Sequence, residues 1–251
     1  MTNRLEVLRR SVAHLQSVVD RLDVIDYQSP AYPTAWSIAD TLSHVGSGSV
    51  IMHRTFDDVI YQRTPDGDFN QMVWDEWNAK SPGAQVADAV VATRELLEAL
   101  ESSSAAQRDD FRAPMGPLTL DFNTFVGLRL NEQALHTWDV EVTQDRAAVL
   151  SSDAAGEIIE SLSLIVRFAG KVDGTTRTVR VRTLDPSRDF TVVYEADSVS
   201  LVDATHDGAV DLELPAEAFA RLVYGRLDPE HTPNGIDEVH LDLLRRTFPG
   251  I

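Results

Sequence analysis

One short segment constrains this chain most, because it puts four ionisable side chains on the apolar side of a predicted helix. Each residue advances an α-helix by about 100°, so the four fall within an arc of roughly 80°. They are Arg129, Glu132, His136 and Asp139. Apolar residues flank the arc on both sides: Leu128, Leu135, Val126 and Val140. A charge left unpaired there costs several kcal/mol, so the segment requires ion pairs or a metal ion.

Two interpretations of this segment stay open from the residues alone. The first is a satisfied polar network whose partners are three residues apart, Arg129 with Glu132 and His136 with Asp139. The second is a metal site that uses Glu132 and His136 as ligands. Because many ordinary helices contain Glu-x-x-x-His, only a third ligand elsewhere in the chain would favour the metal. We expect the opposite side of the helix to face solvent, with Asn131, Ala134, Thr137 and Glu141 on it.

The charge balance excludes several classes of partner. The 251 residues include 22 Lys+Arg and 40 Asp+Glu, a formal net charge of -18. This charge repels phosphate backbones and anionic lipid, so we expect neither nucleic acid nor a membrane as partner. No apolar run approaches the roughly 18 residues of a membrane-spanning helix, and residues 1–22 lack an apolar signal core. We therefore expect a cytoplasmic protein, either a monomer or a homodimer.

The chain contains no cysteine. This excludes disulfides, cysteine-ligated zinc and a cysteine nucleophile. Any metal must therefore be held by histidine and carboxylate side chains, and any thiol chemistry must use a thiol from outside the chain.

The first part of the chain predicts a bundle of amphipathic helices. Apolar residues recur at helical spacing over residues 5–22, 37–61, 81–100 and 121–142. Ser37 as N-cap with Asp40 three residues later marks the start of the second helix. That helix carries His44, which is either a histidine at the edge of the core or a third metal ligand. We expect residues 102–110 to be a polar loop and residues 111–120 an extended arm or turn.

The second part of the chain predicts a smaller α+β domain. A helix is expected over residues 152–170 and another over 215–224, ended by Gly225 as C-cap. Short β-type runs lie between them, at residues 178–182, 190–194, 199–202 and 210–214. Residues 239–248 are apolar but of uncertain type. We place the domain boundary between residues 148 and 149, which gives domains 1–148 and 149–251.

Three sequence motifs resemble one known family. Residues 33–44, Pro-Thr-Ala-Trp-Ser-Ile-Ala-Asp-Thr-Leu-Ser-His, match the Pro-x-x-Trp-[Ser/Thr]-x-x-Asp-x-x-x-His motif of mycothiol-dependent maleylpyruvate isomerase-like proteins. The segment from Arg129 to Asp139 matches their Arg-x-x-Glu-x-x-x-His-x-x-Asp helix, and Gly225-Arg226 is similar to the Gly-Arg element of their C-terminal domain. The resemblance implies a DinB-type four-helix bundle that holds one divalent ion, followed by a domain like sterol carrier proteins.

The resemblance also implies roles for individual residues. His44, Glu132 and His136 match the metal ligands, with zinc as the expected ion. Asp139 and Arg226 match residues beside the metal pocket, and Arg226 could hold a carboxylate in a bidentate fork. On the sequence alone, Arg226 is equally well interpreted as a surface arginine that follows a helix C-cap.

The implied chemistry depends on mycothiol as a low-molecular-weight thiol cofactor or co-substrate. Two histidines and one carboxylate with an open position are typical of catalytic zinc, and a zinc-bound thiol is deprotonated. As an isomerase, the protein would let the thiolate add to a cis-enone and leave again after bond rotation. As an S-transferase, it would stop at the adduct or displace a leaving group. Either reaction acts on a small electrophilic, anionic substrate.

Two other function classes remain. One is a metal-assisted hydrolase in which bound water is the nucleophile. The other is a non-catalytic metal- or ligand-binding module, which a fourth protein ligand such as Asp139 would favour.

Overall fold

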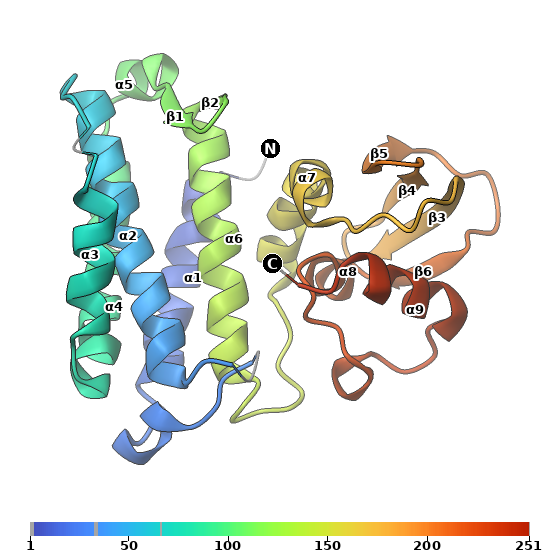
Figure 1. Ribbon diagram of the computed structural model, residues 1–251, viewed down its shortest axis with the longest axis horizontal. Coiled ribbons are helices and arrows are strands. Elements are labelled where there is room, and N and C mark those ends of the chain that lie inside the picture. The colour runs from blue at the N-terminus through green and yellow to red at the C-terminus, as the bar shows by residue number, and fades with distance from the viewer. Residues whose placement is uncertain (1–2, 33–34, 66, 251) are drawn as a thin grey trace. The chain divides into compact units, whose positions relative to one another are not determined.

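The computed structural model describes residues 3–32, 35–65 and 67–250. The chain divides into two compact units, Met1–Ala148 and Val149–Ile251. The first unit is mainly helical, and the second combines a four-stranded sheet with helices (Figure 1). The predicted α+β class, with the helical bundle first and the smaller sheet domain second, is confirmed. Pro33 and Thr34 of the first family motif lie outside the described residues.

Four long helices build the first unit, as the apolar spacing predicts. α2 packs along α4, α1 packs along α6, and α2 also contacts α6. The start of α2 follows the predicted capping box, in which Ser37 and Asp40 each accept a hydrogen bond from the other's backbone N–H. The bundle helices are α1 (Arg4–Val19), α2 (Ile38–Ile60), α4 (Pro82–Ser102) and α6 (Phe122–Glu141) (Figure 1).

Shorter elements complete this unit. α3 (Phe69–Asn78) packs against α2, where a Cβ at Gly46 would lie 2.2 Å from the Trp77 ring, so only glycine leaves room for it. Part of the predicted loop 102–110 is wrong, because Ala105–Asp110 forms α5 behind a capping box of Ser104 and Gln107. The segment predicted as an extended arm or turn contains both, because it forms a hairpin of two short strands. The remaining elements are η1 (Val24–Gln28), β1 (Ala113–Met115) and β2 (Leu118–Leu120).

The solvent-facing side predicted for α6 is wrong. Asn131 and Thr137 are each 1% exposed, and Ala134 is 7% exposed. The prediction assumed that one helix face packs and the other is wet, whereas α6 packs against both α1 and α2. The four ionisable residues therefore lie on a helix that is buried along most of its length, which makes their pairing more important.

The second unit is built on a sheet with strand order β5-β4-β3-β6. β3 pairs antiparallel with β4, β4 antiparallel with β5, and β6 runs parallel to β3. α7 packs on β5 and on α8, and residues 239–248, of uncertain type from sequence, fall largely in helix α9. The elements are α7 (Ser152–Ala169), β3 (Arg177–Leu184), β4 (Arg188–Tyr194), β5 (Val199–Ala204), β6 (Leu212–Pro215), α8 (Ala216–Val223), η2 (Pro229–His231) and α9 (Glu238–Thr247).

None of the described helices is both long and apolar enough to cross a membrane.

Candidate metal centre

The three predicted metal ligands meet at one end of the bundle. His44 lies in the second turn of α2, and Glu132 and His136 lie one turn apart on α6. The start of α2 and the end of α6 are at the same end, away from the hairpin β1–β2 (Figure 1). The helical spacing of four residues places Glu132 and His136 on one face of α6, and the contact between α2 and α6 brings His44 to them.

Two separations within the cluster are close to those around a tetrahedral metal ion. Glu132 Oε2 lies 3.1 Å from His44 Nε2 and 3.4 Å from His136 Nε2. Metal–ligand bonds of about 2.0–2.1 Å at tetrahedral angles place neighbouring ligand atoms about 3.3 Å apart. One ligand atom from each residue lies within 4.8 Å of the others, and within the described ranges no other group of metal-ligating side chains is found. The donor set of two imidazoles and one carboxylate is that of catalytic zinc sites.

Asp139 determines which nitrogen of His136 is available to a metal. Its Oδ2 lies 2.8 Å from His136 Nδ1, and its side chain is fully buried. A carboxylate only accepts, so Nδ1 carries a proton and the neutral ring presents the lone pair of Nε2. That lone pair faces Glu132 Oε2, which is also an acceptor. Two acceptors facing each other require a proton on Nε2 or a cation between them.

The charged forms of the cluster residues stabilise one another. Burial opposes the charge of Glu132, but hydrogen bonds and positive charge from His136 and His44 outweigh it and hold the Glu132 pKa far below its ordinary value. Burial likewise lowers the pKa of His136. Hydrogen bonds to Asp139 and Glu132, with their negative charges, outweigh burial and raise that pKa above its ordinary value. The pocket thus favours a carboxylate and a positive partner together.

Access to the cluster is uneven. The side chains of His44 and Glu132 are 42% and 43% exposed, whereas that of His136 is 10% exposed. The exposed side chains of His44 and Glu132 form the open side of the cluster, and His136 forms its buried side. A ligand from solvent can therefore reach the donor atoms at the open side.

Arg129 is buried one turn before Glu132, at 2% exposure. The predicted pair with Glu132 is not formed; instead, Arg129 Nη2 donates to Gln133 Oε1 at 2.6 Å. Its Nε has no hydrogen-bond partner among the described residues. Burial lowers the Arg129 pKa to about 10, although the charge of Glu132 opposes that shift. A buried cation therefore lies on the same helix face as the ligands.

Trp36 is a residue of this site to which the sequence analysis gave no role. Its ring centroid lies 5.1 Å from that of His44 and 6.1 Å from that of His136. It immediately precedes Ser37, the N-cap of the helix that carries His44. An aromatic residue directly before the N-cap of a ligand-bearing helix is the sequence signal that could have identified it.

Arg226 belongs to the second unit, where it follows Gly225 at the end of α8. Gly225 has φ 73°, and a Cβ there would lie 2.3 Å from Gly250 Cα, so both the turn and the packing require glycine. Arg226 is 9% exposed, unlike a surface arginine, and its Nη1 donates to the Tyr224 carbonyl at 2.9 Å. Arg221 stabilises the same turn, because its Nη1 donates a hydrogen bond to the Arg226 carbonyl.

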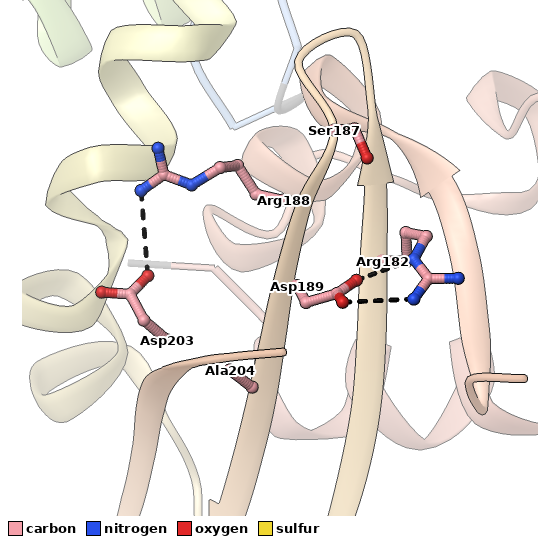
Figure 2. A pocket seen from close by; sticks show the side chains of 6 residues that line it. All are labelled: Arg182, Ser187, Arg188, Asp189, Asp203 and Ala204. Atoms are coloured by element: carbon pink, nitrogen blue, oxygen red, sulfur yellow. Dashed lines mark hydrogen bonds and ion pairs between the residues drawn. The ribbon is translucent and has the colours of Figure 1, made fainter. Parts of the chain in front are cut away.

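The second unit also contains an open pocket of about 650 Å³. Its arginines face carboxylates: Arg182 Nε lies 2.7 Å from Asp189, and Arg188 extends towards Asp203 (Figure 2). Hydrogen bonds from Arg182 lower the pKa of Asp189 to about 2. The charges in this pocket already have partners. It is lined by Arg182, Ser187, Arg188, Asp189, Asp203 and Ala204.

Comparisons with known proteins agree with this architecture. A family model described as the mycothiol maleylpyruvate isomerase N-terminal domain matches residues 8–141, more than half of the chain. A solved structure of the mycothiol-dependent maleylpyruvate isomerase is similar over 89% of this chain and 88% of its own, with a TM-score of 0.63 and 14% identity. A histidine-to-alanine mutant of that isomerase gives the same coverage, a TM-score of 0.64 and 13% identity. No curated protein is matched. At these identities the structural likeness shows the fold alone.

Proposed function

The chain belongs to the family of the mycothiol maleylpyruvate isomerase N-terminal domain, and from this premise we propose that it is a metal- and thiol-dependent enzyme. The thiol is mycothiol, and the reaction is an isomerisation or S-transfer on a small, anionic electrophile. The observation that carries the proposal is the pair of Nε2 atoms on one Glu132 oxygen, 3.1 and 3.4 Å away. A cation at that point would satisfy all three donors.

Each residue of the cluster has a defined task in this proposal. His44, Glu132 and His136 hold a divalent ion, for which zinc is the best fit to the donor set. When bound there, such an ion supplies the charge that keeps a thiol deprotonated at neutral pH. Asp139 holds the Nδ1 proton of His136, so that the Nε2 lone pair points at the ion. The exposed sides of His44 and Glu132 leave the approach for the thiol.

Arg226 is the proposed anion-binding group. In a chain of net charge -18, an anionic substrate needs a local cation to be held. The turn that carries Arg226 is rigid, because Gly225 packs against Gly250 and Arg221 bonds to the Arg226 carbonyl. A guanidinium on a rigid turn can hold a carboxylate in two parallel hydrogen bonds.

Metal analysis and thiol binding test the function together. We expect the purified protein to contain about one divalent ion per chain and to lose it in a His136→Ala variant. His14→Ala is the matched control, because His14 also faces a carboxylate, Glu141 at 2.7 Å, but belongs to no metal cluster. With metal present, mycothiol should raise the melting temperature of the protein, whereas it should not after metal removal.

The same experiment separates this function from the alternatives. Turnover of a substrate without any added thiol would identify a metal-assisted hydrolase. Metal binding without any thermal response to mycothiol would contradict the thiol-dependent reaction.

A further inference from the structure

The two histidines of the cluster differ in what fixes their rings. His136 has Asp139 on Nδ1, which sets both its tautomer and its orientation. For His44, the described residues offer a hydrogen bond on Nε2 alone, to Glu132. Histidine rotates about χ2 over a broad range, so a ligand without an outer partner is held poorly. Among the described residues, the remaining partners that can orient the His44 ring are aromatic rings.

The indole of Trp36 lies where such a partner is needed. It is tilted 45° to the His44 ring at 5.1 Å and lies within 27° of parallel to the His136 ring at 6.1 Å. The two histidine rings are themselves 4.7 Å apart at 70°. One indole therefore contacts both ligand rings, and Trp36 keeps 39% of its surface exposed on the open side.

The backbone around Trp36 is held firmly enough for this task. The Trp36 carbonyl accepts a hydrogen bond from Ala31 N at 2.9 Å, and Ser29 O accepts one from Ile38 N at 2.9 Å. These bonds close the chain on itself through the bridge of Pro30 with Ser37. The indole thus projects from a short antiparallel closure rather than from a free loop.

The same segment is also attached to the helix of the other two ligands. Tyr32 N donates to the Asp139 carbonyl at 3.0 Å, and its ring packs edge-on against Trp138 at 5.2 Å. Trp36 is consequently fixed relative to both α2 and α6. A residue bound to both helices can hold ligands from both in register.

On the basis of the proposed metal site, we propose that Trp36 is a positioning residue for the metal: its ring orients His44, for which the described residues offer no hydrogen bond on Nδ1, and also covers His136. An imidazole bound to a cation gains positive charge, and the face of an indole attracts such charge. The contact therefore strengthens when the metal is present. The exposed part of the ring gives the open side of the site an apolar wall, which lowers the local dielectric around the donor atoms.

Binding of Co²⁺ to the full-length protein tests this proposal, because its affinity, absorption spectrum and quenching of tryptophan fluorescence can all be measured. Trp36→Leu keeps apolar bulk without an aromatic face and should weaken binding about 10- to 100-fold, as loss of an outer-shell partner does. Trp36→Phe retains an aromatic face, so its affinity should stay within about threefold of wild type. Trp74→Phe is the matched control, since Trp74 is 45% exposed on α3.

The spectroscopic readouts distinguish positioning from general packing. Co²⁺ should quench fluorescence in the wild type and in Trp74→Phe, and much less in Trp36→Phe. In Trp36→Leu the Co²⁺ absorption should weaken as the His44 ring leaves its tetrahedral position. Wild-type affinity and spectrum in Trp36→Leu would overturn the proposal, and so would an equal loss in Trp74→Leu. A wild-type protein that binds no Co²⁺ would overturn the metal site itself and this proposal with it.

Discussion

The metal cluster of the helical bundle and the pocket of the second unit differ in whether their charged side chains have partners within the protein. In the pocket, Arg182 and Asp189 meet through two hydrogen bonds of 2.7 and 3.1 Å, so each charge is already matched. At the bundle end, two imidazole nitrogens converge on one oxygen of Glu132. The first arrangement is complete within the protein, whereas the second requires a proton or another cation. The metal cluster is therefore the better candidate for binding, although the pocket of the second unit has a volume of about 650 Å³.

Solvent exposure differs within the bundle end itself. Asp139 is fully buried and His136 nearly so, which leaves little screening of their charges, whereas the side chains of His44 and Glu132 are 42% and 43% exposed. The side chains of Arg182 and Asp189 are 25% and 15% exposed. Arg188 also forms an ion pair with Glu160, and these two side chains are each 41% exposed. Exposed ion pairs contribute little because water and salt screen them. Mutations at the bundle end should have large effects because they remove a metal donor or the partner of one, and mutations in the pocket should have small effects because they alter an ion pair that solvent screens.

The largest effect is expected from Glu132→Gln. This change removes the charged donor that both histidines face, so the metal content of the purified protein should fall from about one ion per chain to near zero. The loss should exceed the 10- to 100-fold that follows removal of an outer-shell partner. Elemental analysis after dialysis against a dilute chelator measures it. The matched control is Asp189→Asn in the pocket, and loss of metal in that variant would break the comparison.

The next effect concerns Asp139. In Asp139→Asn the amide is a weaker acceptor and can present its donor side to His136. The side chain at position 139 then no longer stabilises the tautomer of His136 that carries its proton on Nδ1. We expect metal affinity to fall about 10- to 100-fold while the ligands themselves remain. Competition with a chromophoric chelator gives the affinity. An affinity equal to wild type would mean that Asp139 serves only the fold.

Lowering the pH should release the metal over a pH range in which the ion pair of Arg182 and Asp189 stays charged. The raised pKa of His136 means that its proton is held to higher pH than in an ordinary histidine, and a metal must displace that proton. Affinity should therefore fall by about tenfold for each pH unit below this pKa, since one proton competes with one ion. Asp189, with a pKa of about 2, stays charged throughout. A metal affinity independent of pH between 7 and 5 would contradict the assignment of His136 as a ligand.

The parts of this site that follow local periodicity could be predicted from sequence, and the others could not. The spacing of Glu132, His136 and Asp139 on one helix needs only 100° per residue. The meeting of His44 with that helix followed from a bundle pattern and a family motif. Trp36 reaches the histidines only because the chain folds back through the bridge of Pro30 with Ser37, which no helical period reveals. The same limit explains why Asn131 was placed in solvent although it is 1% exposed.

The smallest effect is expected from Asp189→Asn, and it sharpens the comparison most. The variant keeps one oxygen acceptor, for Arg182 Nε or for the His206 backbone N–H but not for both, and removes the negative charge. Because the pair is partly exposed, the melting temperature should change by only about 1–2 °C at low salt, and the change should shrink in 1 M salt. Metal affinity should stay at the wild-type value. Asp189→Asn also leaves Arg182 and Arg188 with less negative charge around them, so inorganic phosphate should bind the variant more tightly than the wild type. Equal phosphate binding by both proteins would show that the pocket is not neutralised by its own carboxylates, and the contrast with the bundle end would then rest on the metal alone.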